Sequence, residues 1–419
     1  MKYLIIGNGV ASTCAAEAIR QLDPEGAITM VADEAFPPYC RPMISMVLEG
    51  AVPPDRLPIR DKNFYDNLKI TPVLGKRATG IDVKNRRVFV PGNGDSAQTA
   101  IEFDKLLIAS GADPRPVRAE GTGLKNIFYM RTEQHVRGML AALPSARNAL
   151  VLGGGLVGFK AAYGLLRRGI RVTLLIRSGY PLAMQVDETA GKMILDELIR
   201  HGLDVRVGAE VRAFGGNGTV QSAHLSDGTE IPCDMAVIGK GVLPALSFVP
   251  RDDIDTDLGI MVDEHMETRA PGIFAAGDVA EFIDIARQTR WVNAIWPEAV
   301  AQGRIAGMNM AGRPVAYRGS LSRNVIRIFG LDIMTGGIVN PPENTSCRVI
   351  RRISPAQNTY RKLVFHGETL AGMAMINNID QGGVLLSLIQ NKTPIRIPGE
   401  ALLEPSFNAR QVMGGPVFA

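Results

Sequence analysis

The sequence predicts an α/β fold with two three-layer domains, each built on a parallel sheet, and a smaller α+β domain at the C-terminal end. A pattern of apolar strand, glycine turn and alanine- or leucine-rich helix occurs twice, starting at residues 3 and 149. Each time a second apolar strand follows at the distance that a βαβ unit requires. In addition, 419 residues are too many for one compact core.

The first unit starts with the strand-like residues 3–6 (YLII) and the turn 7–12 (GNGVAS). Gly7 permits the turn, and Gly9 lets the backbone approach a pyrophosphate that faces the N-terminus of the helix. Ser12 stands where the third glycine of the pattern is expected. Because a small side chain still fits between helix and strand, we expect a Rossmann-like dinucleotide site here.

The second unit repeats this order with residues 149–152 (ALVL) and the turn 153–158 (GGGLVG). This turn keeps all three glycines, Gly153, Gly155 and Gly158. One such motif also occurs where a helix and a strand merely pack closely. Two motifs, each with strand and helix in place, indicate two bound dinucleotides.

The charge balance excludes several kinds of partner. The chain has 46 basic and 42 acidic residues, a net charge of +4. This balance is too even for a nucleic-acid or anionic-membrane binder, and it gives at most a weak preference for an acidic partner.

The cysteines and the apolar runs predict a cytoplasmic protein. The four cysteines, Cys14, Cys40, Cys233 and Cys347, form no CxxC or metal-ligand pair, so we expect no metal site and a reducing compartment. The first residues do not match a signal peptide. No apolar run reaches the ~18 residues that a membrane span needs.

Four further segments extend the pattern over nearly the whole chain. They are residues 37–45 (PPYCRPMIS), 106–115 (LLIASGADPR), 268–278 (TRAPGIFAAGD) and 295–304 (IWPEAVAQGR). With the two glycine turns, they resemble the FAD-dependent pyridine nucleotide-disulfide oxidoreductase superfamily, and most closely its branch of rubredoxin, ferredoxin and nitrite reductase-type NAD(P)H reductases. The resemblance implies FAD at the first unit and NADPH or NADH at the second.

The resemblance also implies a division into domains. A discontinuous FAD-binding domain covers residues 1–118 and 248–320, and the NAD(P)-binding domain, residues 119–247, is inserted into it. Residues 321–419, with short strand-like stretches and one helix-like stretch, resemble the interface domain of the family. That domain commonly dimerises or docks a partner, which implies a homodimer or a hetero-complex.

An acidic residue after the second strand of the first unit should hydrogen-bond the adenosine ribose of FAD. Asp33 and Glu34 are both candidates, either could instead be a solvated loop charge, and we favour Asp33. The resemblance implies that Asp278 binds the ribityl and phosphate region, and that residues 295–304 bring backbone groups to the flavin ring. The candidate FAD ligands are Gly7, Gly9, Ser12, Asp33, Glu34, Arg41, Ala109, Ser110, Gly111, Arg115, Gly277, Asp278 and Trp296.

In the second unit the corresponding acidic position falls on Ile176, so the carboxylate that would favour the free 2′-hydroxyl of NAD is missing. Arg177 follows, and it is either a ligand for the 2′-phosphate of NADP or a solvated surface charge. The sequence therefore slightly favours NADPH. The candidate NAD(P) ligands are Gly153, Gly155, Gly158, Arg177, Gly239 and Gly241.

Two positions near the flavin differ from those of relatives, which often carry a lysine and a glutamate there. Here these positions are Met46 and Lys160. The resemblance implies that Lys160 brings its charge to the flavin from the opposite domain, where a cation would stabilise the anionic reduced flavin. The alternative is a surface lysine on an amphipathic helix.

Cys40 is the one thiol that the resemblance places near the flavin, and the CxxxxC pair of disulfide reductases is absent from the first helix region. Relatives with the same Arg-Pro pattern commonly have a serine or an aspartate at this position. We therefore interpret Cys40 as a small polar substitute rather than a nucleophile.

These features predict a FAD-dependent NAD(P)H:acceptor oxidoreductase. Hydride would pass from nicotinamide to flavin, and without a redox-active disulfide the electrons would leave from the flavin itself. This favours a small iron-sulfur carrier or a partner redox subunit as acceptor. Two alternatives stay open: a Cys40-dependent NADH oxidase, peroxidase or coenzyme A-disulfide reductase, and a flavoprotein subunit for assembly or redox sensing.

Overall fold

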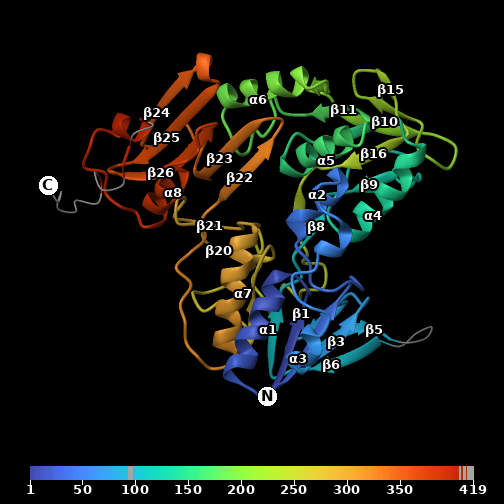
Figure 1. Ribbon diagram of the computed structural model, residues 1–419. Coiled ribbons are helices and arrows are strands. Elements are labelled where there is room, and N and C mark those ends of the chain that lie inside the picture. The colour runs from blue at the N-terminus through green and yellow to red at the C-terminus, as the bar shows by residue number, and fades with distance from the viewer. Residues whose placement is uncertain (93–97, 405–406, 409–411, 413–419) are drawn as a thin grey trace.

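The structure, a computed structural model, describes residues 1–92, 98–404, 407–408 and 412. Figure 1 shows three parts: the N-terminal unit at the bottom, the second glycine-turn unit at the upper right, and the C-terminal domain at the upper left. The fold is α/β with two parallel sheets, as predicted.

Five parallel strands form the first sheet. Their order is β19 (Ile273–Ala275), β7 (Lys105–Ile108), β1 (Lys2–Ile6), β2 (Ala27–Ala32) and β3 (Ile70–Leu74). The strands follow the doubly wound arrangement in which the first strand is central. Because β19 comes from much later in the chain than β7, this unit is discontinuous in sequence.

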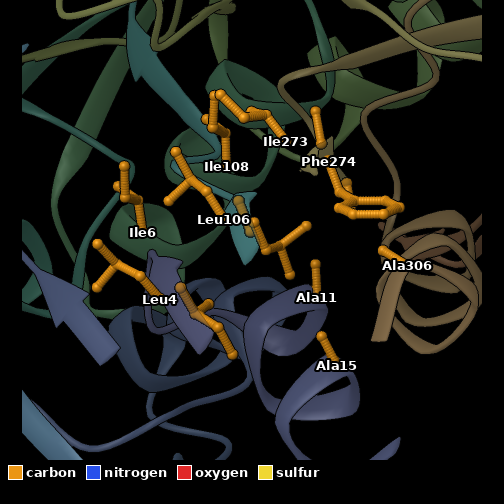
Figure 2. Close-up of a cluster of buried hydrophobic side chains, with 14 of the residues drawn as sticks. Leu4, Ile6, Ala11, Ala15, Leu106, Ile108, Ile273, Phe274 and Ala306 are labelled. Carbon is orange, nitrogen blue, oxygen red and sulfur yellow. The ribbon is translucent and has the colours of Figure 1, made fainter. Parts of the chain in front are cut away.

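Helices α1 (Val10–Leu22) and α7 (Trp296–Met310) pack together at very short range. A Cβ atom built at Gly303 would lie 2.2 Å from the carbonyl oxygen of Ala11, and one at Gly307 would lie 2.4 Å from that of Ala15. Only glycine lets the two backbones approach this closely. The small side chains of both helices then share one core cluster with the strands (Figure 2).

The second sheet is also parallel. Its order is β12 (Asp204–Val207), β11 (Arg171–Ile176), β10 (Asn148–Leu152), β16 (Met235–Ile238) and β9 (Ile127–Tyr129). Along β10, Val151 joins the core under helix α5 (Leu156–Arg167), whereas Leu150 and Leu152 join the core on the opposite face. Burial on both faces explains why this strand is apolar from Ala149 to Leu152.

A three-stranded antiparallel sheet forms the third layer of each unit. These sheets are β4 (Gly80–Asp82), β5 (Arg87–Pro91) and β6 (Gln98–Glu102) in the first unit, and β13 (Val211–Gly215), β14 (Ser222–Leu225) and β15 (Glu230–Pro232) in the second. The chain crosses between the units along an antiparallel ribbon of β8 (Ala112–Pro114) and β17 (Val242–Pro244).

The C-terminal domain is α+β, as predicted. Its antiparallel strands have the order β22 (Arg323–Ile328), β23 (Leu331–Gly337), β26 (Thr369–Ile376), β25 (Thr359–His366) and β24 (Cys347–Ser354). Helix α8 (Gly382–Gln390) packs on this sheet through Leu385 and Leu388. The domain is attached to the second unit at Asp187, whose Oδ2 accepts from the Tyr360 hydroxyl at 2.5 Å and lies 3.0 Å from Lys362 Nζ.

Helix α5 contacts the first unit through α2 (Ile44–Glu49). A Cβ at Gly164 would lie 3.1 Å from Leu48 Cγ, so the two helices are in tight contact. Arg168, at the end of α5, donates from Nε to the carbonyl oxygen of Leu48 at 2.7 Å and from Nη2 to that of Val47 at 3.1 Å. These bonds satisfy carbonyl groups at the C-terminal end of α2.

The same helix contacts the C-terminal domain through Phe329, at the turn between β22 and β23. The Phe329 ring meets the rings of Phe159 and Tyr163 edge-on, with centroids 6.1 and 4.7 Å away. Phe329 is buried even though its φ is +51°, a conformation that is unfavourable for a bulky residue. Burial of the ring offsets this cost and holds the hairpin against α5.

The remaining elements are short or flank the sheets. They are α3 (Phe64–Asn67), α4 (Glu133–Ala142), α6 (Glu188–Arg200), β18 (Ile260–Met261), β20 (Ala280–Ile283), β21 (Arg290–Trp291) and, among the described residues, five short 3-10 helices. Over the described residues, no helix combines the length and the apolar character that crossing a membrane requires.

The contact between α1 and α7 gives a prediction of stability. Replacing Gly303 with alanine should lower the free energy of unfolding by about 1–3 kcal/mol, because the methyl group meets backbone atoms of Ala11 that cannot move aside. Urea denaturation measures this change. The matched control is Gly383→Ala in α8, where no atom lies within 4 Å of the new Cβ, and it should be neutral or slightly stabilising. Equal stabilities of the two variants would contradict the close packing.

Candidate active site

A cavity of about 1440 Å³ lies where the three parts of the molecule meet. Its walls come from the glycine turn after β1, the segment after β2, the end of β7, the loop before α4, the first turns of α5 and α7, and strand β22. Small-molecule sites commonly measure ~300–1,000 Å³. This cavity is therefore large enough for a dinucleotide and a second reactant.

The first glycine turn contains one glycine that the backbone requires and one that a ligand would require. Gly7 has a φ of +122°, and a Cβ there would lie 2.1 Å from the carbonyl oxygen of Ala109. Gly9 faces the cavity at the start of α1, with no side-chain cap and no atom within 4 Å of the place of a Cβ. Free N–H groups and the positive end of the helix dipole are thus directed at a space that fits a pyrophosphate.

Ser12 occupies the place of the third glycine. Its side chain is fully buried, and its Oγ has no hydrogen-bond partner within the described part of the chain. In the second turn a Cβ at the equivalent Gly158 would lie 1.9 Å from the Gly153 carbonyl oxygen. The first turn is therefore slightly wider, which leaves room for the serine and an unused hydroxyl beside the turn.

The two acidic candidates after β2 have different partners. Glu34 is bound by the protein itself: Arg41 Nη2 lies 2.6 Å from its Oε1, and the Tyr39 hydroxyl donates to Oε2 at 2.7 Å. Asp33 is half-exposed and lies 3.5 Å from Arg77 Nη1. Both line the cavity, but Asp33 has more of its carboxylate available for a ribose hydroxyl.

Arg41 connects the first unit with the second. Its Nη1 donates to the carbonyl oxygen of Arg131 at 2.8 Å, and Arg131 Nη2 donates to Asp278 Oδ2 at 2.7 Å. The Tyr39 hydroxyl accepts from the backbone N–H of Glu133 at 3.1 Å. Burial raises the pKa of Tyr39, so its hydroxyl stays protonated and can donate to its acidic neighbour. This network holds the Asp278 carboxylate in place at the cavity wall.

Four cavity arginines, among them Arg77 and Arg131, lie outside every motif in the sequence. Arg131 follows β9 and reaches Asp278 because β9 lies beside β16 at the edge of the second sheet. Its place just after a parallel strand is a signal that could have found it, since ligands bind at the carboxyl ends of such strands. Arg77 donates to Asp113 at 2.5 Å, and no sequence signal marks it.

Most of the other predicted FAD ligands line the cavity, namely Ala109, Ser110, Gly111, Gly277, Asp278 and Trp296. Arg115 does not. It is exposed and outside the lining, and its backbone N–H donates to the carbonyl oxygen of Gly241 at 2.9 Å. The ribbon of β8 and β17 carries Arg115 away from the cavity, so the structure does not support it as a ligand.

Lys160 lines the cavity from the second unit. Burial lowers the pKa of its ammonium group, and nearby Cys40 has a smaller, opposite effect. Met46 is 41% exposed and lies outside the lining. Of the two altered positions, Lys160 alone therefore faces the cavity.

Cys40 lies behind the cavity wall rather than in it. Burial raises the pKa of the Cys40 thiol, while the backbone N–H of Met43 and the charge of Lys160 act in the opposite direction. The thiol is therefore protonated at neutral pH. A protonated thiol fits a small polar substitute better than a nucleophile.

The second glycine turn is more tightly packed than the first. A Cβ at Gly153 would lie 2.5 Å from the carbonyl oxygen of Gly239, and one at Gly239 would lie 2.5 Å from the Cα of Gly158. Gly155 precedes the first residue of α5 and gives the helix no side-chain cap. A Cβ atom built at Gly155 or at Gly241 would have no atom within 4 Å. The turn therefore leaves the same kind of opening for a pyrophosphate as Gly9 does.

The strand register shows which residue of this unit corresponds to Asp33. Leu152 pairs with Leu175 as Ile6 pairs with Val31, so Arg177, not Ile176, corresponds to Asp33. Ile176 is the last residue of β11 and is fully buried. Asp33 lies 33 − 7 = 26 positions after Gly7, but Arg177 lies only 177 − 153 = 24 positions after Gly153, because helix α5 and the loop after it are each one residue shorter than α1 and its loop.

Two parallel sheets, each with a glycine turn that opens at a helix N-terminus, and a cavity where the parts meet are the architecture of an enzyme that binds two dinucleotides. Comparison with known families agrees. Residues 1–303 match the pyridine nucleotide-disulphide oxidoreductase family, and residues 323–393 match the rubredoxin NAD+ reductase C-terminal domain. The chain belongs to the pyridine nucleotide-disulphide oxidoreductase family. The predicted superfamily, the cofactors FAD and NAD(P)H, and the oxidoreductase class are confirmed.

Curated relatives cover most of the chain. The chain is 30% identical over 399 residues to the NADH-dependent phenylglyoxylate dehydrogenase subunit epsilon of Aromatoleum evansii, covering 94% of this chain and 92% of that protein. It is 26% identical to the NADH-rubredoxin oxidoreductase of Clostridium acetobutylicum, covering 93% and 94%. It is 27% identical to the nitrite reductase [NAD(P)H] of Bacillus subtilis, covering 94% of this chain but only 48% of that protein.

A solved structure shows the same fold. The covalent putidaredoxin reductase-putidaredoxin complex matches 99% of this chain and 98% of its own chain, with a TM-score of 0.89 and 23% identity. At this identity the likeness shows the shared fold of the three domains.

The Cys40 thiol gives a prediction of reactivity. Because burial raises its pKa, its thiolate fraction at neutral pH is below that of free cysteine, and iodoacetamide should modify it more slowly. The rate should rise as the pH approaches the raised pKa. Mass spectrometry of alkylated peptides between about pH 7 and 10 measures this. Cys233, whose pKa is raised to about 12 by burial, is the slower internal reference. Alkylation of Cys40 at pH 7 as fast as that of free cysteine would contradict the prediction.

Proposed function

We propose that the enzyme oxidises NADH or NADPH and passes the electrons from FAD to a separate redox protein, either a small iron-sulfur carrier or a partner redox subunit. One observation carries this proposal. None of the four cysteines forms a disulfide within the described residues. Burial raises the pKa of the Cys40 thiol, beside the cavity, so this thiol is protonated at neutral pH. Without a thiol relay, electrons leave directly from the flavin. Free thiols also favour a reducing compartment such as the cytoplasm.

The residues of the first unit would hold FAD by its polar groups. The N–H groups at Gly9 would bind the pyrophosphate, and Asp33 would accept from a ribose hydroxyl. Asp278, fixed by Arg131, would accept from the ribityl chain. Bound FAD would supply the conversion between two-electron and one-electron transfer.

Lys160 would supply the positive charge on the opposite side of the cavity. Arg41 and Arg131 already have carboxylate partners, Glu34 and Asp278, whereas no carboxylate pairs with Lys160 in the described part of the chain. An uncompensated, partly desolvated cation stabilises nearby negative charge more than an exposed one does. We infer that Lys160 favours the reduced, anionic state of the cofactor.

The C-terminal domain would offer the acceptor a path to the cavity. Strand β22 is an edge strand of its sheet, and its residues 323–326 line the cavity. Val325 is 60% exposed, and Arg323 is held by Glu298, with Nη2 to Oε1 at 3.1 Å. An acidic carrier would meet an apolar and basic surface here.

The named relatives support both kinds of acceptor. One is a rubredoxin oxidoreductase, and one solved structure is a complex with putidaredoxin. The relative at 30% identity is a subunit of a dehydrogenase, which favours the partner-subunit form. In a complex of that kind, this chain would carry electrons between the nicotinamide and the catalytic subunit to which it is bound.

The test is anaerobic titration of the FAD-loaded protein with NADH or NADPH, followed by addition of a rubredoxin or ferredoxin. We expect rapid bleaching of the flavin and reduction of the carrier. The variant Cys40→Ser should keep at least about half of the carrier-reducing rate, because the thiol takes no part. Loss of carrier reduction in Cys40→Ser with normal flavin bleaching would favour the thiol-dependent oxidase or disulfide reductase. A flavin that neither nicotinamide bleaches would favour the assembly or sensing subunit.

Removing the charge of Lys160 tests its role. Lys160→Met should lower the flavin midpoint potential by about 30 mV, equivalent to ~1.4 kcal/mol for two electrons, and should slow reduction by nicotinamide. Spectroelectrochemistry measures the potential. Lys192→Met, at an exposed site on α6 where Lys192 pairs with Glu188, removes the same charge far from the cavity and should leave the potential unchanged. Equal potentials in wild type and Lys160→Met would exclude this role.

A further inference from the structure

A charged cluster lies at the carboxyl edge of the second sheet, outside the cavity wall. Arg177 Nε lies 3.8 Å from Glu210 Oε1, and Lys240 Nζ lies 3.5 Å from the same oxygen. The three residues follow three different strands: Arg177 follows β11, Glu210 follows β12, and Lys240 follows β16. The fold therefore collects two cations and one carboxylate at a single place.

This cluster lies where the adenosine ribose of a nicotinamide dinucleotide would bind. Arg177 has the same register position as Asp33, and in this fold that position faces the ribose 2′-oxygen. Lys240 is close to the turn itself, because its backbone nitrogen would lie 3.3 Å from a Cβ at Gly153. Glu210 lies within 4 Å of both cations, so its carboxylate is at the same edge of the sheet.

The charges of the cluster determine whether a dinucleotide with a 2′-hydroxyl or one with a 2′-phosphate on its adenosine ribose binds better. Arg177 alone would attract a 2′-phosphate, but its side chain is 80% exposed and its contact with Glu210 is long. Glu210 is 41% exposed, so its carboxylate is accessible to a ligand. A phosphate at this place would meet the Glu210 carboxylate at short range, whereas a hydroxyl could donate to it.

We propose that Glu210 is the residue that selects NADH, by accepting a hydrogen bond from the ribose 2′-hydroxyl and repelling a 2′-phosphate. It replaces, from the neighbouring strand, the carboxylate that is missing after β11. Arg177 and Lys240 hold Glu210 in position and partly neutralise it. This inference rests on the proposed use of a nicotinamide dinucleotide by the second unit.

Equilibrium binding of ADP-ribose and of 2′-phospho-ADP-ribose to the FAD-loaded protein tests the proposal without any redox step. We expect wild type to prefer ADP-ribose, and Glu210→Gln to shift the ratio of the two dissociation constants by at least about tenfold toward the phosphorylated ligand. Adding Arg177→Gln to Glu210→Gln should reverse most of that shift, because the cation that attracts the phosphate is then lost. Isothermal calorimetry at low ionic strength gives both constants.

The matched control is Glu230→Gln, which removes the same charge from an exposed carboxylate on β15 and should leave the ratio unchanged. A wild-type preference for the phosphorylated ligand, or a ratio in Glu210→Gln equal to that of wild type, would overturn the role of Glu210. Failure of the proposed function is a separate outcome: ADP-ribose would bind with the expected selectivity, but neither NADH nor NADPH would bleach the flavin.

Discussion

The arrangement of the three domains depends on the packing of helix α5. On one side, Gly164 lets the side chain of Leu48 in α2 of the first unit lie against the backbone of α5. Arg168 donates hydrogen bonds to carbonyl oxygens at the end of α2. On the other side Phe329 brings in the C-terminal domain. The N-terminal end of the same helix carries Gly155 and Lys160. One rigid element thus sets the distance between the two dinucleotide sites, the charge in the cavity and the position of β22.

Glycines in this protein have two separable physical roles. Some permit backbone contacts so close that a Cβ atom would overlap the neighbouring residue, as Gly7 does against Ala109 and Gly303 does against Ala11. Others, such as Gly9 and Gly155, have nothing near the place of a Cβ, and they leave space for a ligand at an uncapped helix start. The first kind sets the shape of the fold and the second kind sets what the fold can bind.

The charged side chains around the cavity are of two kinds: some are paired with other residues of the protein, and others remain available to a ligand. Glu34 and Asp278 are paired with arginines that join the two units, so their role is partly structural. Asp33, from the first unit, and Lys160, from the second, also line the cavity and are less constrained. This division fits an enzyme that binds a large anionic cofactor firmly and has, at Lys160, a cation with no carboxylate partner among the described residues.

The sequence by itself determined both glycine-turn units and the α+β C-terminal domain, and the resemblance to a known family indicated the two cofactors. The glycine-turn units are local: strand, turn and helix follow one another within about 30 residues, and their periodicity and glycine spacing are readable in order. It could not show that Arg131 meets Asp278 or that Glu210 meets Arg177, and it matched Ile176 rather than Arg177 with Asp33. Arg115 was expected at the site, but the ribbon carries it away.

Only the tertiary structure decided these points. Which side chains meet at the carboxyl edge of a sheet depends on strand order and register, and the neighbours there come from residues far apart in the chain. Arg131 reaches Asp278 across 147 positions, and Glu210 reaches Arg177 from the next strand of the sheet. The glycine turns are local and could be read directly, whereas the charged side chains beside them are brought together only by folding.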